Sequence, residues 1–476
     1  MANSVIEQKP LYNRLPIGQD IIYVVSNNTA VANELKVKFI AKVYISDTTP
    51  ASTNLIGTFK ATPNNAAVGM FNFRDILENY VKPDSMAYPG SSYKGTTTTF
   101  TRKNYLHSID KYSLNTNSVR YFQIWFSVEY LGGYDGVNPA DDNVVAEQVG
   151  TTAPVQTYTM FNGYLKYTDE LKLNGLDFGF DIAAGTGTVF FPSAAFSRYL
   201  TNAPTTQYAN LEDYGTLAFL APYTAIADEV NKIDFEYFNS TGGSIGTDSV
   251  AKSAFTGAYA TFDSNITKGL VYIGCFPGNL QNWSTTFQAL VAAGTIQDGY
   301  YTISAKNSVG GSTLEVVTIN LNCPDLKGYE SIRLCWLNQW GAWDYYTFTK
   351  KSIKKLTTKG STYNQLGGTW NESAYYLDTY KGGTKAFRVN TTEKITINTG
   401  FVTENDTVIF EELINSPEVY LLDGYQTDLA TPALNQYVTP VRLTTSNFTR
   451  KTVANDRLLQ YTFEIEKSRT LRTQSV

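Results

Sequence analysis

Short segments in which apolar and polar residues alternate with a period of two recur along this chain. In residues 37–45 every second residue is apolar, and Lys38 and Lys42 occupy positions between them. Residues 460–466 alternate in the same way. Because successive side chains of a strand point to opposite faces, this pattern predicts strands with one buried and one solvated side.

Composition and length extend this expectation to the whole chain. Aromatic residues make up 14% of the sequence, including 34 Tyr and 26 Phe, and charged residues make up only 17%. Aromatic side chains favour strands, and a chain of 476 residues is too long for one hydrophobic core. We therefore expect an all-β protein with several Ig-like or related β-sandwich domains and a few short helices.

Three domains are expected. The first is an N-terminal β domain over residues 1–167, with a long exposed loop at about 132–156 that is rich in Gly, Asp and Ala. The second is a middle β-rich domain with short helices over 168–343. The third is a C-terminal β domain over 344–476, whose polar, basic tail either frays or docks.

Local patterns predict individual elements. A strand at 21–25 is expected to join the strand at 37–45 through a turn at Asn27 and Asn28. A central strand is expected at 121–130 and a short helix at 71–81. Helical spacing of apolar residues is found at 283–293. Further strands are expected at 300–306, 314–321, 331–337, 345–348, 386–389, 394–398, 408–410, 419–422 and 441–444.

The sequence gives little support to catalysis. His107 is the single histidine, and no nucleophile motif or metal-ligand spacing surrounds it. The three cysteines have no Cys-x-x-Cys spacing, and no phosphate-binding loop occurs. A solvated loop is a better interpretation of the oxygen-rich residues 135–142 than a calcium site. We expect no enzyme, no cofactor and no metal; carboxylate-based glycan hydrolysis is a weaker hypothesis, because the adjacent Glu411 and Glu412 would point to opposite faces of a strand.

The charge distribution bears on the partners. The net charge is −5, with acidic and basic residues spread along the chain, so no specific nucleic acid partner is expected. The basic cluster that contains Lys350 and Lys354 is either an anion-binding strip or, more simply, a solvated strand and turn. No run of 18 apolar residues occurs, so membrane insertion is not expected. The three cysteines cannot all pair, and their apolar neighbours suggest buried thiols, which favours folding in a reducing cytosol.

A few residues are candidates for interaction. Asp141 and Asp142 lie in the predicted long loop, which could act as a contact arm. Trp340 and Trp343 flank Gly341, where a tight connection and aromatic packing are expected first and a binding site second. Lys350 and Lys354 complete this set. The many aromatic residues suit cores and interfaces, and on an open sheet face they could also stack on sugars.

Several segments resemble virion proteins of tailed bacteriophages of the crAss-like type and others that infect Bacteroidetes. These are the run from Lys9 to Gly18, residues 71–77, the segment 332–348 with its Trp-Leu-Asn and Trp-Asp-Tyr-Tyr-Thr-Phe motifs, and residues 412–422. The resemblance implies a tail, collar or ring component present in several copies around a symmetric tube. It supplies no catalytic residues.

The functional expectation is a virion structural protein that forms a homo-oligomeric ring or hub of a phage tail and links head-proximal and distal tail parts. Its partners would be copies of itself and other virion tail proteins. It would fold in the bacterial host cytoplasm and then reside in the virion tail. The alternative is a receptor- or glycan-binding tail fibre or adhesin, for which a trimer with an aromatic-lined pocket is expected.

Overall fold

The computed structural model describes residues 4–10, 14–46, 54–83, 112–114, 118–132, 144–148, 155–165, 198–220, 230–251, 270–321, 328–404, 406–422, 438–449 and 459–471. The chain divides into two compact units. Unit 1 comprises Met1–Cys323, Leu337–Asp344 and Tyr425–Asn435; unit 2 comprises Pro324–Trp336, Tyr345–Gly424 and Gln436–Val476. Strands dominate the described residues and the helices are short, which confirms the all-β class. The division into three domains stays a prediction.

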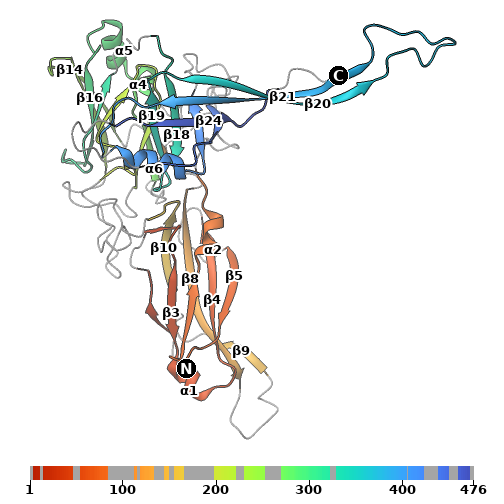
Figure 1. Cartoon of the computed structure of the whole chain (residues 1–476). Helices are drawn as coiled ribbons and strands as arrows, with labels where there is room; N and C mark the ends of the chain where they lie inside the picture. Colours follow the sequence, from red (N-terminus) through yellow and green to blue (C-terminus); the bar gives the residue numbers. More distant parts are fainter. Residues whose placement is uncertain are drawn as a thin grey trace, which may run out of the picture. The chain divides into compact units, whose positions relative to one another are not determined.

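The N-terminal part of unit 1 is a β-sandwich (Figure 1). Its strands are β1 (Val5–Gln8), β2 (Arg14–Pro16), β3 (Ile22–Ser26), β4 (Lys38–Ser46), β5 (Leu55–Ala61), β6 (Val68–Asn72), β8 (Val119–Gly132), β9 (Val144–Gln148) and β10 (Val155–Phe161). One sheet has the order β1–β3–β6, and the other has the order β2–β10–β8–β4–β5 with β9 added to β8. Tyr23 of the first sheet packs against Phe126 of the second, with ring centroids 5.5 Å apart.

Two predicted strands are confirmed in the larger sheet. Strand β4 covers the alternating segment, and its Phe39, Ala41 and Val43 are fully buried. Strand β8 covers residues 121–130 and lies between β10 and β4, so it is central as expected.

The predicted turn at Asn27 and Asn28 is wrong. Helix α1 (Asn28–Asn33) follows β3, because the side chain of Asn27 accepts a hydrogen bond from the backbone N–H of Ala30 at 3.1 Å and caps the helix. Strands β3 and β4 then enter different sheets. The helix predicted at 71–81 is shorter: Phe71 and Asn72 still belong to strand β6, and only α2 (Arg74–Leu77) and the 3₁₀ turn η1 (Glu78–Tyr80) are helical.

The described residues in the rest of unit 1 form two further sheets and the helices α4 and α5. Their elements are β7 (Tyr112–Leu114), β11 (Thr206–Ala209), β12 (Thr216–Leu220), β13 (Lys232–Phe238), β14 (Ser244–Ala251), β15 (Leu270–Gly274), α4 (Pro277–Trp283), α5 (Thr285–Ala292), β16 (Tyr300–Lys306) and β17 (Val317–Leu321). The sheet orders are β11–β17–β16–β13–β14 and β12–β15–β7. The helix predicted at 283–293 is divided: Trp283 ends α4, and most of the remaining residues form α5. Ser284 lies between the two helices and caps α5, because its side chain accepts a hydrogen bond from the N–H of Phe287 at 2.8 Å.

Unit 2 is built around one large sheet. Its elements are β18 (Ile332–Leu337), β19 (Trp343–Phe348), β20 (Ile353–Gln365), β21 (Gly383–Asn398), α6 (Thr407–Asn415), β22 (Val419–Leu422), β23 (Val438–Leu443) and β24 (Thr462–Lys467). The order is β19–β18–β22–β23–β24–β21–β20. The strand predicted at 408–410 is wrong, because Ile409, Phe410 and Leu413 instead bury one face of helix α6.

The connection before β19 has the tight geometry expected from the sequence. The side chain of Asn338 accepts hydrogen bonds from the N–H groups of Trp340 and Ala342, each at 3.0 Å. Gly341 adopts a φ of +75°, and a Cβ added there would lie 2.0 Å from the backbone oxygen of Asn162. Gly341 is therefore required both for its conformation and for the close approach.

Replacing Gly341 by Ala should reduce the stability of unit 1 by about 3 kcal/mol, because left-handed strain and a backbone clash add together. Gly310→Ala is the matched control: its φ is +87°, yet no atom lies within 4 Å of an added Cβ. The control should cost about 1 kcal/mol. Thermal unfolding followed by tryptophan fluorescence measures both, and equal losses would contradict the close approach.

Candidate functional site

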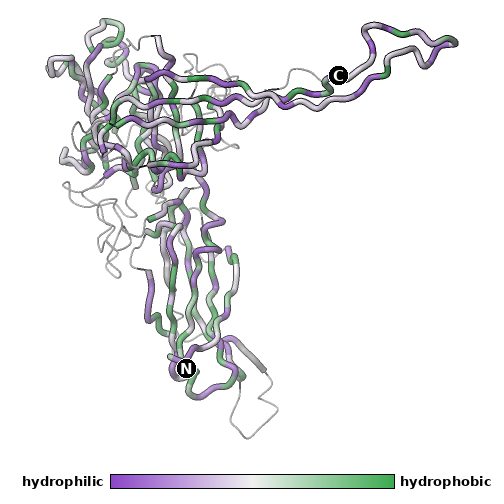
Figure 2. The backbone as a smooth tube through the Cα atoms, in the orientation of Figure 1, coloured by the Kyte–Doolittle hydropathy of each residue, from purple (hydrophilic) through white to green (hydrophobic). Residues whose placement is uncertain are grey.

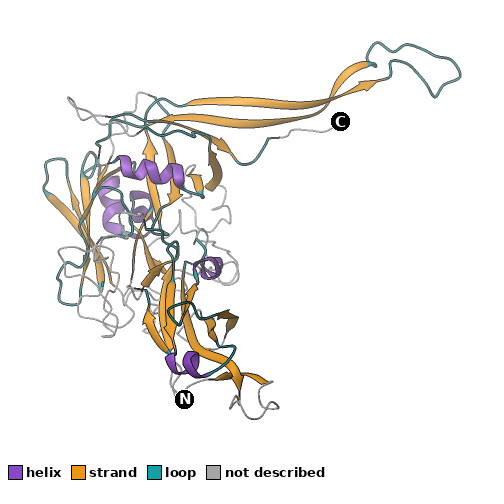
Figure 3. Ribbon diagram, turned by 60° about the horizontal axis from the view of Figure 1, so that its bottom comes forward, coloured by secondary structure: helices purple, strands orange, loops and turns teal. Residues whose placement is uncertain are grey.

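Strands β20 and β21 form a long hairpin that extends beyond its own sheet (Figure 3). They pair from Ile353 and Thr396 at the base to Gln365 and Gly383 at the far end. Strand β24 accompanies β21 only over Lys394–Asn398. We call residues 353–391 the arm and residues 366–382 its tip.

The edges of the arm are largely open among the described strands. Strand β20 is the last strand of its sheet, so its outer edge has no described neighbour. On the β21 side the final contact is at Thr391, which exchanges two backbone hydrogen bonds of 2.9 and 2.8 Å with Leu471. Beyond this point the arm is a two-stranded ribbon. Such a ribbon is marginally stable in water by itself.

One face of the root of the arm belongs to the hydrophobic core of unit 2. Ile395 and Ile397 of β21 are buried and lie opposite Ile465 and Phe463 of β24. Phe463 in turn packs against Phe348, with ring centroids 6.0 Å apart. The core therefore fixes the direction in which β21 leaves the sheet.

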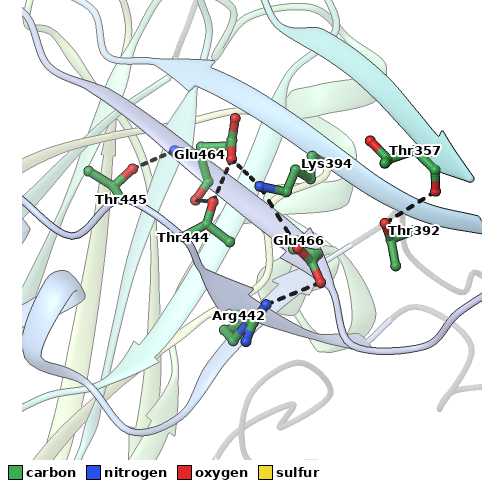
Figure 4. A network of polar contacts seen from close by, with 8 residues as sticks. All are labelled: Thr357, Thr392, Lys394, Arg442, Thr444, Thr445, Glu464 and Glu466. Atoms are coloured by element: carbon green, nitrogen blue, oxygen red, sulfur yellow. Dashed lines mark hydrogen bonds and ion pairs between the residues drawn. The ribbon is translucent and has the colours of Figure 1, made fainter. Parts of the chain in front are cut away.

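The opposite face of the root carries a charge network (Figure 4). Lys394 lies 2.8 Å from Glu464 and 4.0 Å from Glu466, and Arg442 lies 3.3 Å from Glu466. The hydroxyl of Thr444 donates to Glu464 at 2.7 Å. The hydrogen bonds from Lys394 and Thr444 lower the pKa of Glu464 from its ordinary value. The network ties β21, β23 and β24 together where the arm begins.

The two faces of the ribbon differ in chemistry because of strand alternation. Lys355 pairs with Lys394 and therefore lies on the face that continues the charge network. Every second residue of each strand shares that face, so Lys359 and Arg388 lie on it as well. The face that continues the core carries Leu356 and Val389, which are exposed. Lys354, Thr358 and Glu393 share this face, so the arm continues the core outward as a mixed surface in which exposed apolar side chains alternate with polar ones.

The tip has a defined internal structure. The N–H of Thr369 donates to the oxygen of Tyr376 at 3.1 Å, and the N–H of Tyr376 donates to the Thr369 hydroxyl at 2.9 Å. That hydroxyl donates to the oxygen of Ala374 at 3.1 Å. Lys381 pairs with Asp378 at 2.8 Å. An ordered loop keeps its outer side chains in place, which reduces the entropy lost on binding.

Large apolar side chains crowd the arm. Of the 22 that are exposed among the described residues, ten lie between residues 353 and 391. Trp370 is the most exposed on the arm, at 80%. The others are Ile353, Leu356, Leu366, Tyr375, Tyr376, Leu377, Tyr380, Phe387 and Val389. Figure 2 shows apolar stretches along the ribbon, and clustered exposure of this kind marks interaction surfaces.

The interaction candidates predicted from the sequence differ in their exposure to solvent. Trp340 and Trp343 are buried at 2% exposure each, so the structure places both in the interior and neither at a surface. Lys350 is exposed before β20, and Lys354 is the second residue of the arm and pairs with Glu330 at 2.7 Å. Both fit the solvated strand and turn, and a role in binding stays a prediction.

Asp141 and Asp142, with most of the predicted loop at 132–156, lie outside the described residues; strand β9 falls within that range. Sequence reasoning missed the arm itself. The usable signals were the basic residues after 350 and the cluster of aromatic residues at 370–380.

The described residues offer little for chemistry. Among them, no group of three His, Cys, Asp or Glu side chains could hold a metal ion. Burial raises the pKa of the Cys335 thiol well above its ordinary value. Glu411 and Glu412 lie on helix α6 and not on a strand. No helix in the described part of the chain is long and apolar enough to cross a membrane.

Comparison with models of known protein families gives no match, and neither does comparison with curated protein sequences.

Acid should loosen the root of the arm. The pKa of Glu464 is lowered in the folded chain, so its interactions stabilise the fold above the ordinary pKa, about 4.3, and are lost as the pH falls through the folded value. Between pH 5 and pH 3 the intact chain should therefore lose more stability than Glu464→Gln. Urea unfolding at each pH measures the difference, and parallel pH profiles would contradict it.

Proposed function

We propose that this chain is a non-enzymatic structural protein of a tailed bacteriophage virion, a homo-oligomeric ring or hub of the tail that links head-proximal and distal parts through protein interfaces. The observation that carries the proposal is the arm, with its uncovered apolar side chains and open strand edges. The sequence resemblance described above supports the phage context.

The physical argument is that, within one chain, the described residues neither pair with the edges of the arm nor cover its apolar side chains. Beyond Thr391 no described strand pairs with either edge of this two-stranded ribbon, and strand edges of this kind offer backbone groups that another chain can satisfy. Ten exposed large apolar side chains add a hydrophobic driving force, since burying one of them stabilises by about 1.5–3 kcal/mol. Aromatic side chains bury much area with few rotatable bonds, which suits an interface.

A receptor- or glycan-binding role is the second candidate. Trp370, Tyr375 and Tyr380 are exposed at the tip, next to Asn371 and Glu372, which could hydrogen-bond sugar hydroxyls. That role uses only the tip. The assembly role uses the tip together with the ribbon, whose edges and Leu356 are also uncovered, so it accounts for more of the surface.

Mass photometry of the purified chain, with negative-stain imaging of the same sample, tests the assembly role. The intact chain should form closed rings. A tip variant with Trp370, Tyr375, Tyr376 and Tyr380 all changed to Ser should shift to single chains, because the aromatic contacts are lost.

The matched control changes exposed apolar residues away from the arm, Tyr208→Ser and Val309→Ser, and should assemble like the intact chain; these side chains are 65% and 87% exposed. A compact trimer that binds glycans would favour the fibre role instead. An intact chain that stays monomeric at tens of micromolar would contradict self-assembly.

A further inference from the structure

Unit 1 has a surface with exposed apolar side chains of its own, on the outer side of the β1–β3–β6 sheet, and none of the described strands or helices packs on it. Val24 of β3 pairs with Met70 of β6, and Ser26 pairs with both Val68 and Val5. Directly paired residues share a face, so the outer side presents Val5, Ile22, Val24, Val68 and Met70 together with the polar residues Gln8, Ser26 and Asn72. We call this side the acceptor face. Met70 is 64% exposed and Val5 is 54% exposed.

Strand β3 explains why this face is unusual. Its inner residues Tyr23 and Val25 are fully buried in the sandwich. Its outer residues Ile22 and Val24 are also apolar, although they are only half-buried. An antiparallel strand at a solvated surface normally alternates with polar residues, whereas apolar residues on both sides are typical of a strand covered on both faces. The sequence of β3 therefore suits a sheet that a partner covers.

Charge separates the arm from unit 1. Residues 353–391 contain six basic and two acidic residues. Unit 1 contains 20 basic and 29 acidic residues. The arm is thus positive and unit 1 is negative, so contact between them is electrostatically favourable. Two arms placed side by side would instead bring Lys355, Lys359 and Arg388 near their own copies, and like charges that face each other are destabilising.

We infer that the arm of one copy docks on the acceptor face of a second copy. The inference rests on the proposed self-assembly and adds its geometry. The arm and the acceptor face are different surfaces of the chain, so the contact is heterologous. Heterologous contacts that close on themselves give rings, in which every arm and every acceptor face is used. Uncovered apolar surface on both sides then becomes buried in one interface.

Two variants, each with one of the two proposed contact surfaces changed, test whether the arm of one copy binds the acceptor face of the next. The tip variant defined above has a damaged arm and an intact acceptor face. An acceptor variant, Val5→Lys with Met70→Lys, has an intact arm and a face that repels it. Both substituted side chains are more than half exposed, so the fold should tolerate the changes. Leu55→Lys with Val309→Lys, at 52% and 87% exposure, is the matched control in unit 1.

Each variant alone should be monomeric, and the control should form rings. An equimolar mixture of the two variants, one of them ¹⁵N-labelled, should give a 1:1 heterodimer by native mass spectrometry. In it the arm of the acceptor variant occupies the face of the tip variant, and no second contact can form. Circular dichroism checks that both variants are folded before mixing.

The other outcomes are distinct. Rings from the acceptor variant alone would overturn the inference in favour of arm-to-arm contact or another face. A mixture of folded variants that stays monomeric would also overturn it. If nuclease treatment dissolved the rings of the intact chain, the basic arm would bind a nucleic acid and the inference would be overturned as well. An intact chain without rings would instead remove the proposed function itself.

Discussion

One part of strand β21 lies inside the large sheet of unit 2 and the other part lies in the arm. The position of the arm depends on how the first part is held. Near its end, Ile395 and Ile397 are buried against β24, while Lys394 on the other side joins the charges of Glu464 and Glu466. Hydrophobic burial on one face and ion pairs on the other hold this part of the strand rigidly. Toward the tip, the same strand runs for several residues beside β20, and no other described strand pairs with it there. A rigid root is what allows a thin ribbon to present a surface in a defined direction.

The uncovered surface has an energetic meaning. Folded proteins leave scattered apolar side chains in water at little cost, but ten on one hairpin are a concentrated exception. The tip does not collapse on itself to hide them, because Thr369 orders the loop from inside and leaves Trp370 outside. Binding to such a preordered loop loses less conformational entropy than binding to a flexible one. The acceptor face of unit 1 offers a second apolar surface whose area a partner could bury.

Sequence patterns were most informative where local chemistry decides the structure. The alternation at 37–45 gave β4, and the apolar run at 419–422 gave β22. The patterns failed where one side chain or a residue distant in sequence determines the local structure. Asn27 caps a helix and does not close a hairpin. The short apolar run at 408–410 fits one face of a helix as well as it fits a strand. The buried Trp340 and Trp343 confirm a packing role that their sequence context suggested first.

The arm could not be derived from sequence for a related reason. Residues 386–389 and 394–398 were expected as two strands and form parts of one, β21. Nothing local distinguishes Leu356 or Val389 from residues that face a core, because they are exposed only for want of a layer of described residues packed against their face of the ribbon. Whether an apolar residue is covered is a property of the tertiary structure, and in an assembly it is a property of the neighbouring chain.

Amide hydrogen exchange of the arm, compared between separated single chains and assembled particles, tests the central claim most directly. In single chains the amides of residues 353–365 and 383–390 should exchange fast, since a two-stranded ribbon opens readily. In the assembly they should become protected, together with those of β3 and β6, while β16 stays unchanged. Protection of the arm that is equal in both states, or strong in the single chain, would contradict its role as the element that joins one copy to the next.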